Sequence, residues 1–376
     1  MTGDPTDWIT VASVPGLGAL SIKRLWEGGW TPGKLLNADL PELQRLGLKP
    51  KTIDALSSLS KGGNSQIQCK VERALEWLNH TPEAAIVPIT SPDYPELLRE
   101  IADPPPVLFC KGNLSALNLP QLAMVGSRNP SATGLRNAYN FSSYLAQHGL
   151  IINSGLALGI DAAAHQGCVD HNCATVAVLG TGMATLYPYR NRKLTEQILD
   201  THGVLVSEFF PDVPPLAANF PKRNRIISGM SAGVLVVEAA LKSGSLITAR
   251  MAVEQNRDVF AIPGPLNNPM SKGCHKLIRN GAHLVESAEE IIVEIGHILG
   301  VFSADPRHQD APEKNQLTEH LSAPEQVLLD SIGFEQQKLD QIVINTGFPM
   351  HEVAQILVSL ELKGLVAQSM GGYIRL

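Results

Sequence analysis

Short apolar segments alternate with helical segments through the middle of the 376-residue chain, and no other feature constrains the fold as strongly. The apolar segments are nearly continuous rather than alternating with polar residues, which is typical of strands covered on both faces. This repetition predicts an extended Rossmann-like fold of the α/β class, with a doubly wound, mostly parallel sheet and right-handed crossovers. The expected strands are Ala85–Ile89, Val107–Cys110, Leu122–Gly126, Leu150–Asn153, Thr175–Leu179, Val204–Glu208, Val234–Ala239, Asp258–Pro263 and His283–Glu286.

The composition fits a folded protein of the cytoplasm. Hydrophobic residues make up 44% of the chain and charged residues 18%, so apolar surface for a large core is ample. No apolar run approaches the roughly 20 residues of a membrane helix, and Met1–Trp8 lacks the features of a secretory signal. The five cysteines form no C-x-x-C pair, which favours a reduced, cytoplasmic setting. The net charge of −6 means that any nucleic-acid surface must be a local patch.

Changes in residue pattern and composition along the chain predict four regions. In the first region, a turn at Gly16 and Gly18 opens a helix, and a second turn near Gly47 partly repeats it. Such a SAM/helix-hairpin-helix-like turn either offers backbone N–H groups to a phosphate or simply packs helices together. The four regions are residues 1–80 (helical), 81–300 (Rossmann-like), 301–320 (a polar linker) and 321–376 (a winged helix).

The last region has the element order of a winged helix. Helices are expected at 323–332, 338–345 and 349–363, followed by strands at 365–368 and 373–376. A winged helix that reads duplex DNA needs Lys and Arg to neutralise phosphates, yet this region has three such residues against six acidic ones. This balance favours protein contact or plain packing over major-groove binding.

Several catalytic or metal-binding patterns match by accident. Gly28–Leu35 resembles a P-loop but lacks the Ser or Thr that coordinates Mg²⁺. Gly229–Gly233 fits G-x-S-x-G, but its strand and helix come in the wrong order for a nucleophile elbow. The histidines and cysteines of residues 165–173 have a spacing that matches no common closed zinc site. We therefore expect no catalytic residue and no metal.

Four expected strands end in glycine-rich turns, and ligands of parallel sheets bind at the edge where the carboxyl ends of strands meet. In the first turn, Gly126 lets the backbone approach an anion, while Ser127 and Arg128 offer a hydroxyl and a bidentate cation. The N-terminus of the following helix adds donors. Four such turns on one edge predict phosphate binding. The other candidates are Ser154, Gly155 and Gly159 in the second turn, Gly180, Thr181 and Gly182 in the third, and Lys242, Ser243, Gly244 and Ser245 in the fourth.

The sequence argues against a dinucleotide cofactor. The G-x-G-x-x-G fingerprint is missing after the first of these four strands. The second strand ends in Asn153-Ser154, without an acidic residue to hold a ribose hydroxyl. We therefore expect no cofactor, and a mononucleotide or a run of phosphates remains as the ligand.

A basic cluster beside an aromatic residue favours a run of phosphates. Lys222, Arg223 and Arg225 form the densest group of cations in the chain, and Phe220 lies two residues before them. Cations that follow a backbone, next to an aromatic face that stacks a base, are typical of sequence-neutral binding of single strands. The alternative is that Arg223 and Arg225 make salt bridges or cap carbonyls within the sheet, and that Phe220 belongs to the core.

With these residues assembled, the sequence resembles the DNA-processing protein A (DprA/Smf) family of bacteria. The matching motifs run from about Tyr94 to Glu286, and the flanking helical and winged-helix regions also fit. The matching stretches are Tyr94–Pro95, Asp103–Phe109, Val125–Arg128, Ser154–His165, Val178–Gly182, Tyr187–Pro188, Phe220–Ile227, Ser243–Ala249 and Phe260–Gly264.

The resemblance implies a domain that binds single-stranded DNA without sequence preference, forms a homodimer and loads the recombinase RecA onto DNA during natural transformation. It also implies that Arg128 contacts phosphate, that Phe220 stacks a base and that Gly180–Gly182 line the pocket. The chain departs from the family at one position. Many members have a Lys three residues before the Phe-Pro pair, where this chain has Ala217. Either Lys222 substitutes for that Lys or DNA binding is weaker than is usual for the family.

Two other functions stay open on the sequence. Nucleotide phosphoribohydrolases have related folds, and Glu238, Asp161 and His165 are candidate groups for acid–base chemistry. The P-G-G-x-G-T-x-x-E signature of those enzymes is absent, because Leu-Lys-Ser-Gly-Ser-Leu-Ile-Thr stands in its place at 241–248. The second alternative is a scaffold protein whose acidic winged helix makes the functional contacts.

Overall fold

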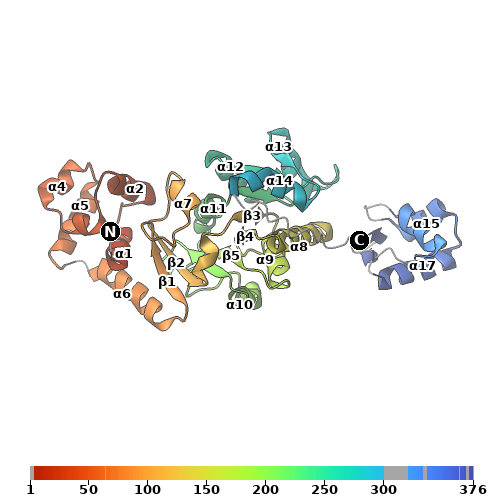
Figure 1. Ribbon diagram of the computed structural model, residues 1–376, viewed down its shortest axis with the longest axis horizontal. Coiled ribbons are helices and arrows are strands. Elements are labelled where there is room, and N and C mark those ends of the chain that lie inside the picture. The colour runs from red at the N-terminus through yellow and green to blue at the C-terminus, as the bar shows by residue number, and fades with distance from the viewer. Residues whose placement is uncertain are drawn as a thin grey trace. The chain divides into compact units, whose positions relative to one another are not determined.

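A nine-stranded sheet forms the core of the larger of the two compact units in the computed structural model (Figure 1). Its strands are β1 Ala84–Pro88, β2 Val107–Gly112, β3 Gln121–Val125, β4 Ile151–Ser154, β5 Thr175–Val178, β6 Val204–Ser207, β7 Gly233–Val236, β8 Asp258–Ala261 and β9 His283–Leu284. Their order is β1-β2-β6-β5-β4-β3-β7-β8-β9. The strands from β6 to β9 in this order are parallel, whereas β2 pairs antiparallel with both β1 and β6. The predicted mostly parallel α/β sheet is confirmed.

The structure describes residues 4–63, 65–299, 321–332, 337–363, 365–369 and 372–375. They belong to two compact units, Met1–Ser303 and Ala304–Leu376. The linker expected at 301–320 lies outside the described residues. None of the helices in the described ranges combines the length and the apolar character that crossing a membrane requires.

Helices cover both faces of the sheet. They are α7 Glu96–Glu100, α8 Ala132–Gln147, α9 Ile160–Val169, α10 Arg192–Asp200, α11 Asn219–Gly229, α12 Ser245–Glu254, α13 Lys272–Arg279 and α14 Ala288–Leu299. On one face, α8, α9 and α14 pack over buried side chains that include Leu122 and Ile152. On the other face, α11 and α12 pack over a cluster that includes Ala123 and Val234. Neighbouring residues of β3 therefore point to opposite, equally buried faces, which explains its continuous apolar sequence.

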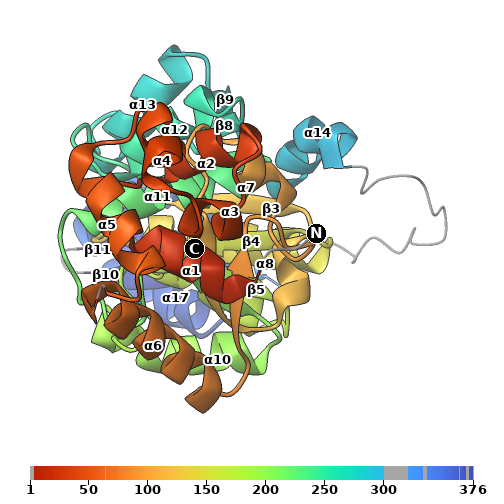
Figure 2. The same cartoon turned by 90° about the vertical axis from the view of Figure 1, so that its left-hand side faces the viewer.

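Six helices precede the sheet: α1 Pro5–Ser13, α2 Ala19–Glu27, α3 Pro32–Leu36, α4 Leu40–Arg45, α5 Pro50–Ser60 and α6 Ser65–His80. Figure 2 views the molecule from their end, with α1 to α6 in red to orange. The turn between α1 and α2 packs on α5. Gly16 has a φ of +87°, and a Cβ there would lie 2.4 Å from the hydroxyl of Thr52. That hydroxyl donates to the carbonyl of Pro15 at 2.9 Å. This first glycine turn is thus engaged in packing.

The helical region is joined to the sheet through aromatic rings and an ion pair. The rings of Trp77 in α6 and Phe109 in β2 have centroids 5.9 Å apart, and Phe109 and Phe210 are 5.3 Å apart. Arg73 in α6 also pairs with Asp212 at 2.9 Å. Phe210 and Asp212 lie in the loop between β6 and α11, so α6 supports the loop that leads into α11.

The second unit is a winged helix in element order, as expected. Its elements are α15 Ala323–Ser331, α16 Leu339–Thr346, α17 Met350–Leu362, β10 Val366–Ser369 and β11 Gly372–Arg375. Of the three Lys and Arg residues in 321–376, two are used internally, because Lys363 pairs with Glu325 at 2.7 Å and Arg375 with Asp330 at 3.3 Å. Hydrogen bonds from Lys363, Ser359 and Ser322 lower the pKa of Glu325 to about 2.

Candidate nucleic-acid interface

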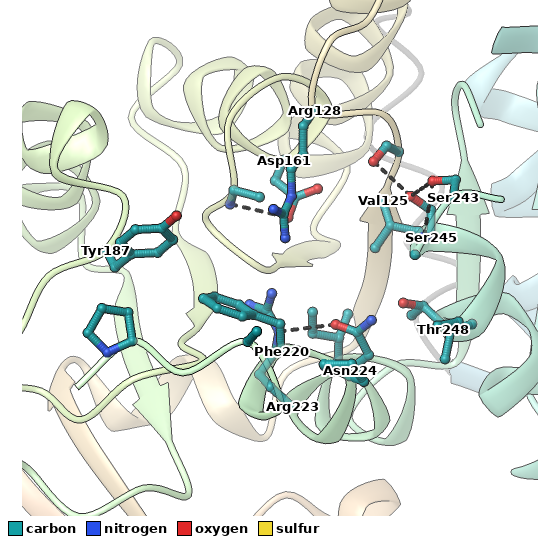
Figure 3. Close-up of a pocket in the computed structure, with 18 residues that line it drawn as sticks. Val125, Arg128, Asp161, Tyr187, Phe220, Arg223, Asn224, Ser243, Ser245 and Thr248 are labelled. Atoms are coloured by element: carbon teal, nitrogen blue, oxygen red, sulfur yellow. Dashed lines mark hydrogen bonds between the residues drawn. The ribbon is translucent and has the colours of Figure 1, made fainter. Parts of the chain in front are cut away.

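A cavity of about 620 Å³ opens at the carboxyl ends of β3, β4 and β7 (Figure 3). The chain proceeds from β3 outward to β6 on one side and then resumes at β7 on the other side of β3. This reversal is the topological switch point, where doubly wound sheets bind their ligands. Loops after β3, β4, β5, β6 and β7 all contribute to the cavity wall.

The loops after β3 and β7 are locked together. The hydroxyl of Ser245 donates to the carbonyl of Gly126 at 2.7 Å, and the hydroxyls of Ser243 and Ser245 are 3.0 Å apart. Gly126, Ser243, Gly244 and Ser245 all line the cavity, as the sequence predicted for this edge. The first N–H groups of α12 already donate within the loop, since Ser245 N–H donates to the Ser243 hydroxyl and Leu246 N–H to its carbonyl.

Arg128 and Phe220 lie on opposite sides of the cavity and point toward each other (Figure 3). The guanidinium carbon of Arg128 is 5.7 Å from the centroid of the Phe220 ring. Arg128 is exposed, and no carboxylate in the described part of the chain forms an ion pair with it. Phe220 is half-buried, and its ring centroid is 5.6 Å from that of Tyr187. An unpaired cation and an aromatic ring therefore line the same cavity.

Arg223 is held inside the protein. Its side chain donates from one nitrogen to the carbonyls of Gly155, at 2.7 Å, and Val178. The residue is 4% exposed, and burial lowers the pKa of its guanidinium to about 10. Arg223 forms part of the cavity wall, but its Nη1 is engaged by the ends of β4 and β5, and its Nε donates to Asn224 at 3.2 Å. This corrects the expectation that Arg223 guides a strand, and it matches the carbonyl-capping alternative.

Arg225 is also used internally. Its guanidinium pairs with Glu208 at 2.6 Å and with Asp103 at 2.9 Å. Burial raises the pKa of Glu208, an effect that Arg225 opposes. Arg225 does not line the cavity, so the salt-bridge alternative is the one that fits its contacts. Lys222 and Lys242 are exposed outside the cavity wall, which leaves both free to approach a ligand that extends beyond it.

The candidate residues of the second and third glycine turns serve packing, and Gly180–Gly182 lie outside the cavity wall that the resemblance implied for them. The hydroxyl of Ser154 is buried and donates to the carbonyl of Met124 at 2.6 Å. Gly180 lies against the Phe220 ring, where a Cβ would come within 2.7 Å of the ring. The Thr181 hydroxyl donates to the carbonyl of Thr185 at 2.8 Å. The predicted residues that lie outside the cavity wall are Ser127, Ser154, Gly155, Gly159, Gly180, Thr181, Gly182, Lys222, Arg225 and Lys242.

The N-terminus of α8 is occupied by a carboxylate of the chain itself. The backbone N–H of Ser131 donates to Glu238 at 2.9 Å, and the Ser131 hydroxyl donates to the other oxygen of Glu238 at 2.6 Å. The same hydroxyl accepts from the N–H of Gly134 at 3.0 Å. Glu238 and the Ser131 hydroxyl therefore already occupy two of the N–H groups that were expected to face a phosphate at this helix end.

The two other candidates for acid–base chemistry are also engaged internally. Asp161 accepts from the backbone N–H groups of Gly155 and Ala157 at 3.2 and 3.3 Å. Burial raises its pKa, although Arg223 and these N–H groups act in the opposite direction. His165 is fully buried and contacts the hydroxyl of Thr175 at 2.8 Å. Burial lowers the pKa of His165 to about 3, so the ring is neutral at physiological pH.

Tyr187 and Asn224 also line the cavity, although neither was expected as a site residue from its sequence pattern. The signal for Tyr187 was an aromatic residue soon after the third glycine turn, at the carboxyl end of a strand. In the described residues, no group of three or more His, Cys, Asp or Glu side chains is arranged to hold a metal ion. All five cysteines are free thiols.

The fold and the site together define a Rossmann-like protein with a switch-point cavity and a C-terminal winged helix. The family model described as DNA recombination-mediator protein A matches residues 85–296, and the model described as DprA winged helix domain matches residues 312–372. The chain belongs to the DprA/Smf family, as its motifs predicted.

Curated relatives and solved structures agree with this assignment. Protein Smf of Escherichia coli (strain K12) is 41% identical over 99% of this chain and 96% of its own length. DNA processing protein DprA of Streptococcus pneumoniae is 47% identical over 54% of this chain and 71% of its own length. The crystal structure of the S. pneumoniae protein superposes with a TM-score of 0.67 at 33% identity, covering 78% of this chain and 99% of that one.

A further structure concerns the single-stranded DNA binding mode of DNA processing protein A from Helicobacter pylori. It is similar to this chain with a TM-score of 0.50 and 29% identity, over 54% of this chain and 93% of that one.

Proposed function

We propose that the chain binds single-stranded DNA at the switch-point cavity, without sequence preference and without cleaving it. One observation carries this proposal: the unpaired guanidinium of Arg128 lies over the ring of Phe220. A cation and an aromatic face at this spacing suit one nucleotide, with the phosphate at Arg128 and the base on Phe220. The H. pylori relative, described for its binding of single-stranded DNA, supports the same choice of ligand.

The contacts of the acidic and histidine side chains favour binding over catalysis. Glu238 is held by Ser131, Asp161 by backbone N–H groups and His165 by Thr175. A nucleotide phosphoribohydrolase needs an acid or base within reach of the N-glycosidic bond. Glu238 and His165 are buried and lie outside the cavity wall, and Asp161, which lines it, already accepts two hydrogen bonds at Oδ2. Incubation with nucleoside monophosphates should therefore release no free base, and release of base would support the enzyme instead.

We further propose that the protein acts as a homodimer in the cytoplasm and loads RecA during natural transformation. This part rests on membership of the DprA/Smf family. The acidic winged helix is assigned to protein contact, because two of its three cations are already paired. Sedimentation velocity tests the dimer. Deletion of residues 321–376 should leave DNA binding intact, and RecA binding by the shortened chain would show whether the winged helix takes part.

The central experiment compares single-stranded with double-stranded oligonucleotides over a range of salt concentrations. Fluorescence anisotropy should show tighter binding of single strands, equal affinity for unrelated sequences and a steep loss of affinity as salt increases. Equal affinity for both forms of DNA would contradict the stacking of bases. Affinity that does not depend on salt would contradict the phosphate contacts.

A further inference from the structure

The segment after the third glycine turn holds a second set of aromatic and basic side chains. Residues 187–193 read Tyr-Pro-Tyr-Arg-Asn-Arg-Lys, so two aromatic rings and three cations fall within seven residues. Among the aromatic side chains of the described ranges, only Tyr187 and Tyr189 belong to the exposed class, at 44% and 72%. An isolated exposed ring needs no explanation. Here two exposed rings lie two residues apart in the sequence, and the first of them lines the cavity.

Tyr187 connects this segment to the candidate interface. It lines the cavity, and its ring centroid is 5.6 Å from that of Phe220. Tyr189 follows two residues later and begins a short helical turn, Tyr189–Asn191. Phe220, Tyr187 and Tyr189 therefore progress from a half-buried ring in the cavity to a largely exposed ring outside it.

The backbone that carries Tyr189 is anchored although its ring is exposed. The side-chain amide of Asn191 donates to the carbonyls of Leu156, at 2.8 Å, and Ala157, at 3.2 Å. Ala157 itself lines the cavity. The hydroxyl of Thr195 donates to the Asn191 carbonyl at 2.9 Å. A ring on an anchored backbone loses little conformational freedom when a base stacks on it.

The charges of the segment suit a polyanion. Arg190 is exposed, and no carboxylate in the described part of the chain pairs with it. Arg192 pairs with Glu196 at 3.0 Å and also donates to the hydroxyl of Tyr189 at 3.5 Å. Whereas Arg223 and Arg225 are engaged internally, Arg190 is an exposed cation three residues after Tyr187, which lines the cavity. Sequence-neutral binding of single strands combines this kind of cation with stacking rings.

We propose that Tyr189 and Arg190 form a second nucleotide subsite, which continues the path of a single strand out of the cavity past Tyr187. A base stacks on the ring of Tyr189, and Arg190 contacts the adjoining phosphate. This inference rests on the proposed function and adds an outer subsite to it. Its distinguishing consequence is a dependence on length, since only a strand longer than the cavity reaches Tyr189.

The test titrates the full chain with labelled oligothymidylates of about four to about sixteen nucleotides, the range that single-strand-binding folds cover. Tyr189→Ala and Arg190→Ala should leave binding of the shortest oligomer within about twofold and weaken binding of the longest by about fivefold or more. Tyr189→Phe should retain the affinity, since it keeps the ring. Arg250→Ala is the matched control, because Arg250 is an exposed cation outside the cavity wall.

Two results would overturn the outer subsite. One is a Tyr189→Ala variant that binds every length like the parent chain, or that loses the same factor at every length. The other is a change of oligomeric state in sedimentation, which would assign the ring to a protein contact. A failure of the proposed function would give a different result, because the parent chain itself would then bind no oligomer of any length.

Discussion

The guanidinium carbon of Arg128 lies 5.7 Å from the centre of the Phe220 ring, and the two residues come from distant parts of the chain. Arg128 belongs to the loop after β3, and Phe220 lies in the first turn of α11. Their approach depends on the switch point, where the loops after several strands converge. The contact places a positive charge and a stacking surface in one cavity. The role of each residue in DNA binding can therefore be tested separately.

Replacement of Arg128 tests the phosphate contact. Arg128→Ala should weaken binding of every sequence by a similar factor and reduce the slope of log affinity against log salt by about one unit. The reason is that one phosphate is no longer neutralised. Anisotropy titrations at several salt concentrations measure both quantities, with Arg250→Ala as the control. An unchanged slope would exclude Arg128 from phosphate contact.

Replacement of Gly180 tests the stacking surface without touching any charge. A Cβ at Gly180 would lie 2.7 Å from the Phe220 ring, so Gly180→Ala must displace that ring. We expect an affinity loss of about 1–3 kcal/mol, similar to that of Phe220→Ala, with an unchanged salt slope. Gly18→Ala is the control, since a Cβ there meets nothing within 4 Å. Normal binding by Gly180→Ala would show that the position of the ring is unimportant.

Replacement of two cations of α11 should have opposite effects, one on DNA binding and the other on stability. Lys222 is exposed, so Lys222→Ala should reduce the salt slope of DNA binding while stability changes by less than about 0.5 kcal/mol. Arg225 pairs with Glu208 and Asp103, so Arg225→Ala should lower the free energy of unfolding by about 3 kcal/mol. Urea denaturation and anisotropy separate the two effects. A stable Arg225→Ala variant with weakened DNA binding would reverse the assignment.

Position 217 tests the departure from the family pattern. Ala217 is exposed and lines the cavity. Ala217→Lys should therefore place a cation beside the strand, raise the affinity and increase the salt slope by about one unit. Ala217→Gln is the matched control, because it adds a side chain of similar length without charge. Equal affinities for the Lys and Gln variants would indicate that Lys222 already supplies this contact.

The buried ring of His165 predicts a pH dependence of stability. Its folded-state pKa is about 3, whereas an unfolded histidine titrates near 6.5. Below about pH 6.5 the unfolded chain therefore binds a proton that the folded chain does not, so stability falls by about 1.4 kcal/mol per pH unit. His165→Gln should remove this contribution. Urea denaturation at about pH 7 and about pH 5 measures it, with the exposed His80→Gln as control.

The sequence predicted the strands well because burial on both faces leaves a continuous apolar signal, as in β3 and β7. It also placed the first and fourth glycine turns on one edge of the sheet, where Gly126 and Ser245 are in contact because β3 and β7 are neighbours. The strands and the turns at their ends could be predicted because both depend on short stretches of sequence, namely apolar runs and glycines.

The sequence did not predict the roles of individual cations as well as it predicted the strands and turns. A run such as Lys222–Arg225 does not show which side chain faces inward, yet Arg223 is three and four residues before the buried Ile226 and Ile227. That helical spacing places Arg223 on the buried face and was the available signal. The Glu238 carboxylate at the N-terminus of α8 had no such signal, because it depends on a long-range approach between β7 and α8.

Arg223 joins the carbonyl ends of β4 and β5 to α11, the helix that carries Phe220. The floor and the stacking wall of the cavity are thereby cross-linked by a side chain that water hardly reaches. A cavity held together in this way keeps its shape with and without ligand. The conformational entropy lost on binding is therefore lost mainly by the flexible DNA strand. That loss comes from the sugar-phosphate backbone, which every DNA sequence shares, so a preformed cavity of this kind suits binding without sequence preference.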